Sequence, residues 1–229
     1  MAAAIAYEQP SMESSWRAFM AHLGTLFVVL LLSVSLSLVG SGVAWLVQFV
    51  AEALLGASTS DGSAAILLAT LISRLAQLPF IILSSVVGIL LTAIPAMHYE
   101  TGQIITIEMA FATLMRRPWR YILAGLLFGL ASTIGFFMCI LPGIVILLTT
   151  PVYVNRIFNG EASIINTFTG SFQAIFGSDR GMTFIGIQLL TVLVVIVVSI
   201  CTCGLGGLIA GPMATFYIQN SAYRQGILR

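Results

Sequence analysis

The feature that most constrains the fold is a run of 35 residues between Arg120 and Arg156 that contains no charged side chain. A straight helix of that length would reach roughly 52 Å, far beyond the ~30 Å hydrocarbon core of a bilayer. Pro142 and Gly143 lie a little past the middle of the run, and both residue types interrupt helices. The run therefore predicts a transmembrane hairpin whose turn is at Pro142-Gly143.

Composition supports a chain whose solvent is the lipid bilayer. Hydrophobic residues make up 59% of the sequence and charged residues 7%, against about 25% charged in soluble domains. The formal net charge is +1, and the basic residues form no stripe that could displace counterions from phosphates. We therefore expect the lipid bilayer as a partner and no nucleic acid. The N-terminal residues lack the basic region of a cleaved signal peptide, so the first apolar span is expected to remain as an anchor.

The hairpin unit recurs along the chain. Residues 181–223 form a second uncharged run that is too long for one crossing, with the sequence CGLGG at 203–207 near its middle. Amphipathic patterns precede each hairpin: one follows Ser11, one follows Thr106, and one follows Ser163. Equivalent residues also recur, since Tyr153-Val154-Asn155 resembles Tyr217-Ile218-Gln219.

These patterns predict an all-α fold: a polytopic transmembrane helical bundle of six spans in three hairpins, each preceded by an interfacial amphipathic helix. The whole chain, residues 1–229, is expected to form a single integral membrane domain. Its units would be residues 1–100, with the first interfacial helix and hairpin, then residues 101–160 and residues 161–229. Gly56–Ser63, which is small and polar throughout, is the expected outer loop of the first hairpin.

The distribution of arginine predicts the orientation. With six spans, the two termini and the second and fourth loops share one side, and that side holds eight of the nine arginines: Arg17, Arg116, Arg117, Arg120, Arg156, Arg180, Arg224 and Arg229. Only Arg74 falls elsewhere. The positive-inside rule then places both termini in the cytoplasm and both hairpin turns outside. The expected location is a bacterial plasma membrane or an internal, thylakoid-like membrane.

One family resemblance follows from the second and third units. The sequence LPGI at Leu141–Ile144 is followed by an apolar span and by a short helix with Ser171-Phe172 ahead of a charged glycine turn. This order resembles the membrane domain attached to some bacterial glycerophosphodiesterases, and its stand-alone six-span relatives of unknown function. The resemblance covers about residues 105–225 and implies a bacterial six-span membrane domain. It brings no diesterase chemistry, because the soluble catalytic domain of those enzymes has no counterpart in this sequence.

Two sets of residues are candidates for specific contacts. Glu52 and Arg74 could form a structural ion pair near the outer interface, or Arg74 could be a functional charge in a pathway. Cys139, Cys201 and Cys203 all fall at the outward turns. They could be small apolar side chains, or Cys139 could form a disulfide with one of the other two. A metal site is the least favoured use, because no histidine or carboxylate is near those turns.

The paired glycines and the two histidines each have two possible roles. Gly125 with Gly129, and Gly207 with Gly211, are spaced to let helices approach closely, either inside the bundle or against a partner. His22 and His98 fall at the cytoplasmic edge, where they could be plain interfacial residues or could ligate haem or the magnesium of a chlorophyll.

The sequence contains no set of residues that predicts catalysis, so we expect no enzyme activity and no cofactor. The favoured function is a non-enzymatic scaffold or accessory subunit of a membrane complex, or a protein of membrane organisation. Its partners would be other membrane proteins or further copies of itself. The alternative is a transporter or channel for a lipid or another small hydrophobic molecule, which repeats and proline kinks favour but the scarcity of charge within the spans disfavours.

Overall fold

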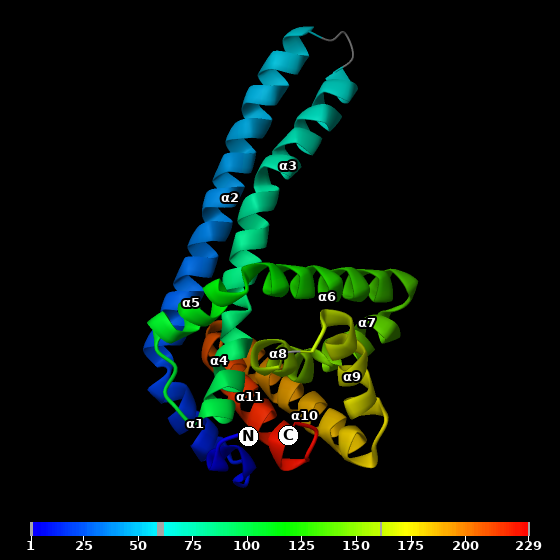
Figure 1. Ribbon diagram of the computed structural model, residues 1–229. Helices are drawn as coiled ribbons and strands as arrows, with labels where there is room; N and C mark the ends of the chain where they lie inside the picture. Colours follow the sequence, from blue (N-terminus) through cyan, green and yellow to red (C-terminus); the bar gives the residue numbers. More distant parts are fainter. Residues whose placement is uncertain (1, 59–61, 161, 229) are drawn as a thin grey trace. The chain divides into compact units, whose positions relative to one another are not determined.

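The computed structural model describes residues 2–58, 62–160 and 162–228, and within these ranges it contains helices and no strand (Figure 1). The all-α class predicted from the sequence is confirmed. The elements in chain order are η1 (Ala4–Tyr7), α1 (Met12–Ala21), α2 (Leu23–Ser58), α3 (Gly62–Gly88), α4 (Leu90–Thr101), α5 (Ile107–Arg116), α6 (Pro118–Met138), α7 (Ile140–Leu148), α8 (Thr150–Asn159), α9 (Ile164–Phe176), α10 (Asp179–Cys201) and α11 (Leu205–Arg224).

Several helical segments are long and apolar enough to cross a membrane. Among the described residues there are four: Leu23–Leu55, Ser63–Thr101, Pro118–Met138 and Asp179–Cys201. The pair α7 and α8, bent by 41° at their junction, would add a fifth if it forms one broken span. α11 is not among them, and its last turns carry Gln219, Asn220 and Ser221. The expectation of several membrane-spanning helices is confirmed at this level, and the count of six spans in three hairpins stays a prediction.

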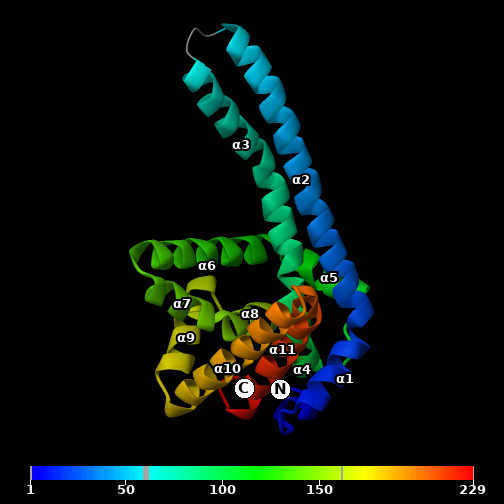
Figure 2. The same ribbon diagram turned by 180° about the vertical axis from the view of Figure 1, so that it is seen from behind.

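The chain forms two compact units, residues 28–89 and residues 1–27 with 90–229. In the smaller unit, α2 and α3 run antiparallel (Figures 1 and 2). The Ser84 hydroxyl is 2.7 Å from that of Ser37 and donates to the Ser33 carbonyl at 2.9 Å. A Cβ at Gly40 would come within 2.5 Å of the Phe80 side chain. Gly40 is therefore a close-packing position of the helix pair.

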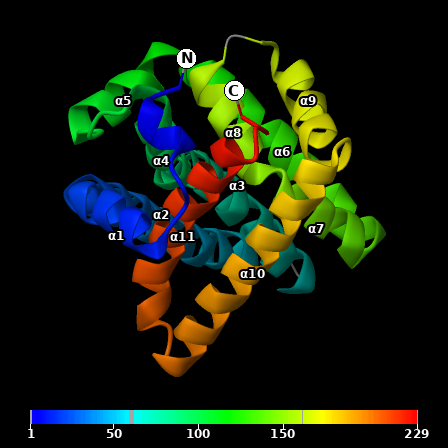
Figure 3. The same ribbon diagram turned by 90° about the horizontal axis from the view of Figure 1, so that it is seen from below.

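The larger unit is built around the meeting of α4, α8 and α11, which pack against one another. α1 packs on α11, α6 pairs with α7, and α10 pairs with α11 and contacts α9 (Figure 3). Fully buried side chains mark this core: Leu90, Ile94, Tyr153, Ile157 and Phe216. Residues 59–61 of the predicted Gly56–Ser63 loop lie outside the described residues. The described parts of that stretch are helical, because α2 continues to Ser58 and α3 starts at Gly62.

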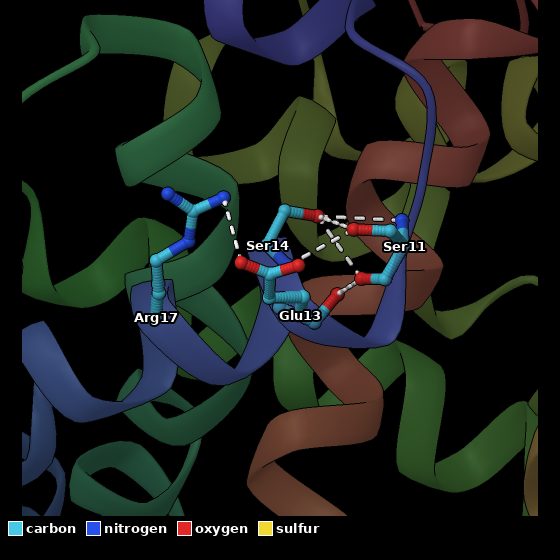
Figure 4. A network of polar contacts seen from close by, with 5 residues as sticks. Ser11, Glu13, Ser14 and Arg17 are labelled. Carbon is cyan, nitrogen blue, oxygen red and sulfur yellow. Dashed lines mark hydrogen bonds and ion pairs between the residues drawn. The ribbon is translucent and has the colours of Figure 1, made fainter.

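The three amphipathic segments predicted from the sequence are the helices α1, α5 and α9. Each begins after a capping side chain: Ser11 accepts from the Ser14 backbone N–H, Thr106 from that of Met109, and Ser163 from that of Asn166. Ser14 returns a contact to the Ser11 backbone, completing a capping box, and Arg17 pairs with Glu13 at 3.6 Å (Figure 4). Ser11, Thr106 and Ser163 thus share one role, since each caps the start of a helix.

The turn predicted at Pro142-Gly143 lies earlier in the chain. The chain reverses at Cys139, whose extended backbone separates α6 from α7, whereas Pro142 and Gly143 lie within the first turns of α7. Proline is tolerated there because the first N–H groups of a helix lack intrahelical acceptors. Gly143 is buried, and a Cβ on it would overlap the Phe136 ring. Gly143 therefore permits close contact between α6 and α7 and does not form the turn.

The turn predicted at the CGLGG sequence, residues 203–207, lies between α10 and α11. α10 ends at Cys201 and α11 begins at Leu205. The intervening Cys203 and Gly204 have φ angles of 52° and 92°. Glycine adopts this left-handed region at little cost, which explains its presence at position 204.

Candidate functional site

Four side chains form a hydrogen-bonded group in the larger unit: the buried Asn155, Gln219 and Tyr223 and the half-buried Glu100. We term this group the Asn155 cluster. The Asn155 amide donates to Gln219 Oε1 at 3.2 Å and to the Tyr223 hydroxyl at 3.0 Å. Tyr223 in turn donates to Glu100 Oε2 at 2.7 Å. The Gln219 amide donates to the Pro151 carbonyl at 2.9 Å. The cluster joins α4, α8 and α11 by side-chain hydrogen bonds at their point of contact.

The Asn155 cluster connects the two sequence copies directly. Asn155 and Gln219 are equivalent positions of the repeated Tyr-aliphatic-amide pattern, and they are buried against each other. Amide side chains suit this position because each supplies both a donor and an acceptor. A buried amide without a hydrogen-bond partner would be costly. Here the Asn155 amide of one copy donates to the Gln219 amide oxygen of the other.

A polar cavity of about 740 Å³ opens beside the cluster. It is lined by both signs of charge, with Glu100 and Asp179 opposed by Arg156 and Arg180, together with Asn155, Asn159, Gln173 and the C-terminal residues Gln225 to Leu228. Arg156 is half-buried and its Nη2 is 3.5 Å from the Ile227 carbonyl. Such a lining can hydrogen-bond a polar or zwitterionic group. No arrangement of three or more His, Cys, Asp or Glu suited to a metal ion occurs in the described part of the chain.

The N-terminal segment is held against the same core. Asn220, which is buried, donates to the Ala6 carbonyl at 2.9 Å. The Ala3 N–H reaches the carbonyls of Tyr99 and Glu100 at 3.1 Å. Arg224 Nη1 donates to the Tyr7 carbonyl at 3.2 Å. The two ends of the chain therefore lie together beside the Asn155 cluster.

His22 has a structural role at the junction of α1 and α2. The side chain is fully buried; its Nδ1 is 2.7 Å from the Ala18 carbonyl and its Nε2 accepts the Ile105 N–H at 3.0 Å. This arrangement requires the neutral ring with the proton on Nδ1, and burial lowers the pKa of His22 below its ordinary value. Because both nitrogens are engaged, this geometry leaves no lone pair for haem or chlorophyll. The His98 ring lies 4.7 Å from it.

Glu52 and Arg74, the expected ion pair, have other partners in the structure. Glu52 Oε1 accepts from Gln48 Nε2 at 2.9 Å, one turn earlier in α2. Arg74 Nη1 donates to Gln77 Oε1 at 3.4 Å, within α3. The Gln77 amide oxygen thus gives the Arg74 guanidinium a hydrogen-bond acceptor within the same helix.

The three cysteines at the predicted outward turns are all free and exposed. Cys139 lies at the turn between α6 and α7, whereas Cys201 and Cys203 lie at the turn between α10 and α11. These two turns are well separated within the larger unit (Figures 2 and 3). The disulfide between copies that the sequence allows is not formed in this arrangement.

The two glycine motifs differ in what they face. A Cβ at Gly207 would come within 2.5 Å of Ser199 Oγ, so this glycine permits packing of α11 on α10. By contrast, a Cβ at Gly125, Gly129 or Gly211 would meet no atom within 4 Å, and Gly125 and Gly129 are both exposed on α6. Bundle packing therefore explains Gly207, and the α6 motif is available for a contact outside the described chain.

Sequence reasoning missed the Asn155 cluster and the polar cavity. Asn155 and Gln219 were visible as repeat positions, but nothing local predicts that they meet Tyr223 and, through it, Glu100 of α4. A usable signal was the presence of neutral amides in helices that are otherwise apolar, because such groups need buried partners.

Comparisons with known proteins give no relative: no family model matches the chain, and neither the curated proteins nor the solved structures include a significant match.

Proposed function

We propose that this chain is a multi-pass membrane protein that acts as a non-enzymatic scaffold or accessory subunit of a membrane complex. The observation that carries the proposal is the exposed small-residue face of α6. Gly125 and Gly129 each cost helix stability, about 1 kcal/mol relative to alanine, and they pack against nothing within the described chain. Lipid gains little from glycine, whereas a second helix can approach closely across it. A partner helix on α6 accounts for both residues.

The hairpin of α2 and α3 adds a second large surface for association. Its inner contacts are serine hydroxyls and the Gly40–Phe80 contact, whereas bulky apolar side chains point away from the pair. Trp45 is 70% exposed and Leu54 68% exposed. Within a bilayer, lipid chains or apolar partner helices would cover such a surface.

The alternative function, handling of a lipid or small hydrophobic molecule, is supported by one specific feature. An apolar groove of about 500 Å³ is lined by residues of α10 and α11 and by Met12 of α1. Its lining includes Leu190, Val194, Ile209 and Met213, apolar side chains that suit contact with a hydrocarbon chain. The described lining of the groove contains no charged residue, so the groove favours an apolar ligand over an ion.

The arginine distribution supports a cytoplasmic location for both termini. In the proposed orientation, α1, α5 and α9 lie at the cytoplasmic interface with the Asn155 cluster and the polar cavity near them. The membrane would be a bacterial plasma membrane or an internal one, as the resemblance to bacterial six-span membrane domains suggests.

Purification from the native membrane in a mild detergent, with mass spectrometry of retained proteins and lipids, tests the proposal. A scaffold should retain a defined protein partner in stoichiometric amount, and the double variant Gly125→Leu/Gly129→Leu should lose it. Gly186→Leu is the matched control, because Gly186 is also exposed in a long apolar helix and meets no atom within 4 Å. Recovery of the chain alone with one defined lipid or hydrophobic molecule would contradict the scaffold and favour lipid handling.

A further inference from the structure

Two side chains at the junction of α1 and α2 hold the connection between α4 and α5, residues 102–106 (Figure 1). His22 Nε2 accepts the Ile105 N–H at 3.0 Å, and the Thr25 hydroxyl donates to the Ile105 carbonyl at 3.0 Å. The Ile105 side chain is 1% exposed. Both backbone groups of one buried residue are therefore bound by side chains that lie one helical turn apart. We term this contact the Ile105 clasp.

The Ile105 clasp requires the neutral imidazole of His22. Nδ1 lies 2.7 Å from the Ala18 carbonyl and carries the ring proton, so the lone pair that accepts from Ile105 is on Nε2. In the imidazolium both ring nitrogens carry a proton. An Nε2–H would face the Ile105 N–H, so that two donors oppose each other. Protonation of His22 therefore replaces a hydrogen bond by a repulsive contact.

The immediate neighbours of His22 disfavour a charge on its ring. The His98 ring of α4 lies 4.7 Å away and the Phe216 ring of α11 lies 5.3 Å away, measured between centroids. Burial lowers the pKa of His22 below its ordinary 6.5, and the positive charge that His98 can carry lowers it further. The closed clasp therefore resists protonation, whereas a released His22 in contact with water accepts a proton at its ordinary pKa.

The other titratable groups on the surrounding helices supply no counter-ion to His22 within the described chain. Glu13 pairs with Arg17 on α1, and Glu100 of α4 accepts from Tyr223 of α11. The remaining charged side chains of the flanking segments are exposed: Glu8, Glu108, Arg116 and Arg224. Tyr99 and Tyr223 are neutral near pH 6, because tyrosine titrates near pH 10. A proton on His22 would therefore meet no compensating charge in the closed clasp.

α5 lies between the Ile105 clasp and a second fixed point at the start of α6. There, the Arg120 guanidinium donates to the Gly160 carbonyl at 3.0 Å, which ties α6 to the end of α8. Between these two points, the buried side chains of α5 are Ala110 and Leu114. Segments with few buried apolar side chains open at a low free-energy cost. Loss of the clasp would therefore free the connection and α5 while α6 stays in place.

His98 provides a neighbouring contact that acid does not remove. Its Nδ1 lies 2.9 Å from the Gln103 carbonyl, within the same connection. Because the carbonyl only accepts, His98 donates from Nδ1 in this contact, and the imidazolium keeps that N–H. The two histidines thus hold one connection by hydrogen bonds of opposite direction, and only the bond of His22 depends on a free lone pair.

We propose that the Ile105 clasp is an acid-sensitive switch, in which protonation of His22 at Nε2 releases residues 102–106 and frees α5 from the core of the larger unit. The step takes one proton from water, and the Ile105 N–H and the imidazolium N–H each exchange their contact for a hydrogen bond to water. In the proposed orientation α5 lies at the cytoplasmic interface, so the switch responds to cytoplasmic acid. The switch is independent of whether the chain is a scaffold.

The test measures hydrogen–deuterium exchange of the full chain in mild detergent, in the fragment that covers residues 102–106. Exchange is compared at pH 7.5 and pH 5.5, with each rate divided by the intrinsic rate at that pH. Because the released form binds a proton at about pH 6.5 and the closed form does not, the protection of the Ile105 N–H should fall by up to about tenfold. Residues 219–224 at the end of α11 are the internal reference and should stay protected.

Substitutions of the two histidines identify the group responsible. His22→Gln places an amide oxygen near the position of Nε2 without a titratable group, so Ile105 should be protected at both pH values. His22→Asn reaches only the position of Nδ1, so the Ile105 N–H should exchange rapidly at both. His98→Gln is the matched control, because it removes the neighbouring histidine and leaves the bond between His22 and Ile105 in place; its response to acid should persist.

Constant protection of Ile105 in the natural chain, or an equal loss in His22→Gln, would overturn the proposal. Loss of protection in residues 219–224 together with residues 102–106 would also overturn it, because acid would then unfold the whole unit and not release α5. If His22→Gln fails to fold, His98→Gln decides the matter. A lost acid response in that variant would assign the response to His98 and contradict the switch.

Discussion

The hydrogen bond between Asn155 and Gln219 gives the sharpest prediction about what holds the larger unit together. In Asn155→Ala, the chain loses two buried hydrogen bonds, to Gln219 Oε1 and to the Tyr223 hydroxyl. Each is worth about 0.6 to 1.5 kcal/mol between helices. Gln219 is 1% exposed, so its unsatisfied oxygen costs roughly 1 kcal/mol or more in addition. The expected loss in the free energy of unfolding is about 2 to 4 kcal/mol.

The assay is a double-mutant cycle on the purified chain in mild detergent, with unfolding followed by the fluorescence of its three tryptophans. Asn155→Ala, Gln219→Ala and the double variant should show a coupling of about 0.5 to 1.5 kcal/mol, because the two side chains are in direct contact. Asn166→Ala is the control: Asn166 is exposed on α9, and the change should stay within about 0.5 kcal/mol.

A coupling below about 0.3 kcal/mol would refute the reasoning. It would mean that the two amides do not meet in the folded chain. The pairing of the two sequence copies at their equivalent positions would then be wrong, whatever the stabilities of the single variants.

Two further perturbations test other parts of the fold. Burial holds the pKa of His22 below its ordinary 6.5. The neutral side chain therefore stabilises the fold above pH 6.5, and this contribution is lost as the pH falls below 6.5 towards the folded-state pKa. The unfolding temperature should drop between pH 7 and pH 5, and the drop should be smaller in His22→Asn. Gly143→Leu should destabilise the chain by more than about 2 kcal/mol, because its side chain would displace Phe136. Pro142→Ala should stay within about 0.5 kcal/mol, and the opposite order in thermal unfolding would restore Pro142-Gly143 as the turn.

Local signals predicted much of the secondary structure. Ser11 ahead of an amphipathic pattern gave the start of α1, and the recurrence of Thr106 as Ser163 gave the starts of α5 and α9. Each depends only on a capping side chain and the residues of the next turn. The glycines at 204–207 likewise predicted a turn that requires a positive φ.

The errors arose where a residue serves tertiary packing. Gly143 looks like a breaker in the sequence, yet it is buried within a helix so that Phe136 can approach. Gly40 likewise lies inside α2, where the absence of a side chain admits Phe80 from α3. Sequence periodicity cannot distinguish a glycine that ends a helix from one that brings two helices together.

The candidate site was the least predictable part. The Asn155 cluster combines Glu100 with residues from α8 and α11, so it exists only after three separate helices have packed. The hydrogen bond from Arg120 to the Gly160 carbonyl was not visible either, because it joins residues 40 positions apart.

The measurement that tests the account most directly is labelling of the native cysteines with a membrane-impermeant maleimide on intact spheroplasts. Cys139, Cys201 and Cys203 are exposed at the two hairpin turns, and the positive-inside rule places both turns on the outer side. For a chain in the plasma membrane, the account predicts labelling at both turns without permeabilisation; for an internal membrane, the same result is expected from the lumenal side of isolated vesicles. Labelling only from the cytoplasmic side, or at one turn from each side, would contradict the proposed membrane arrangement.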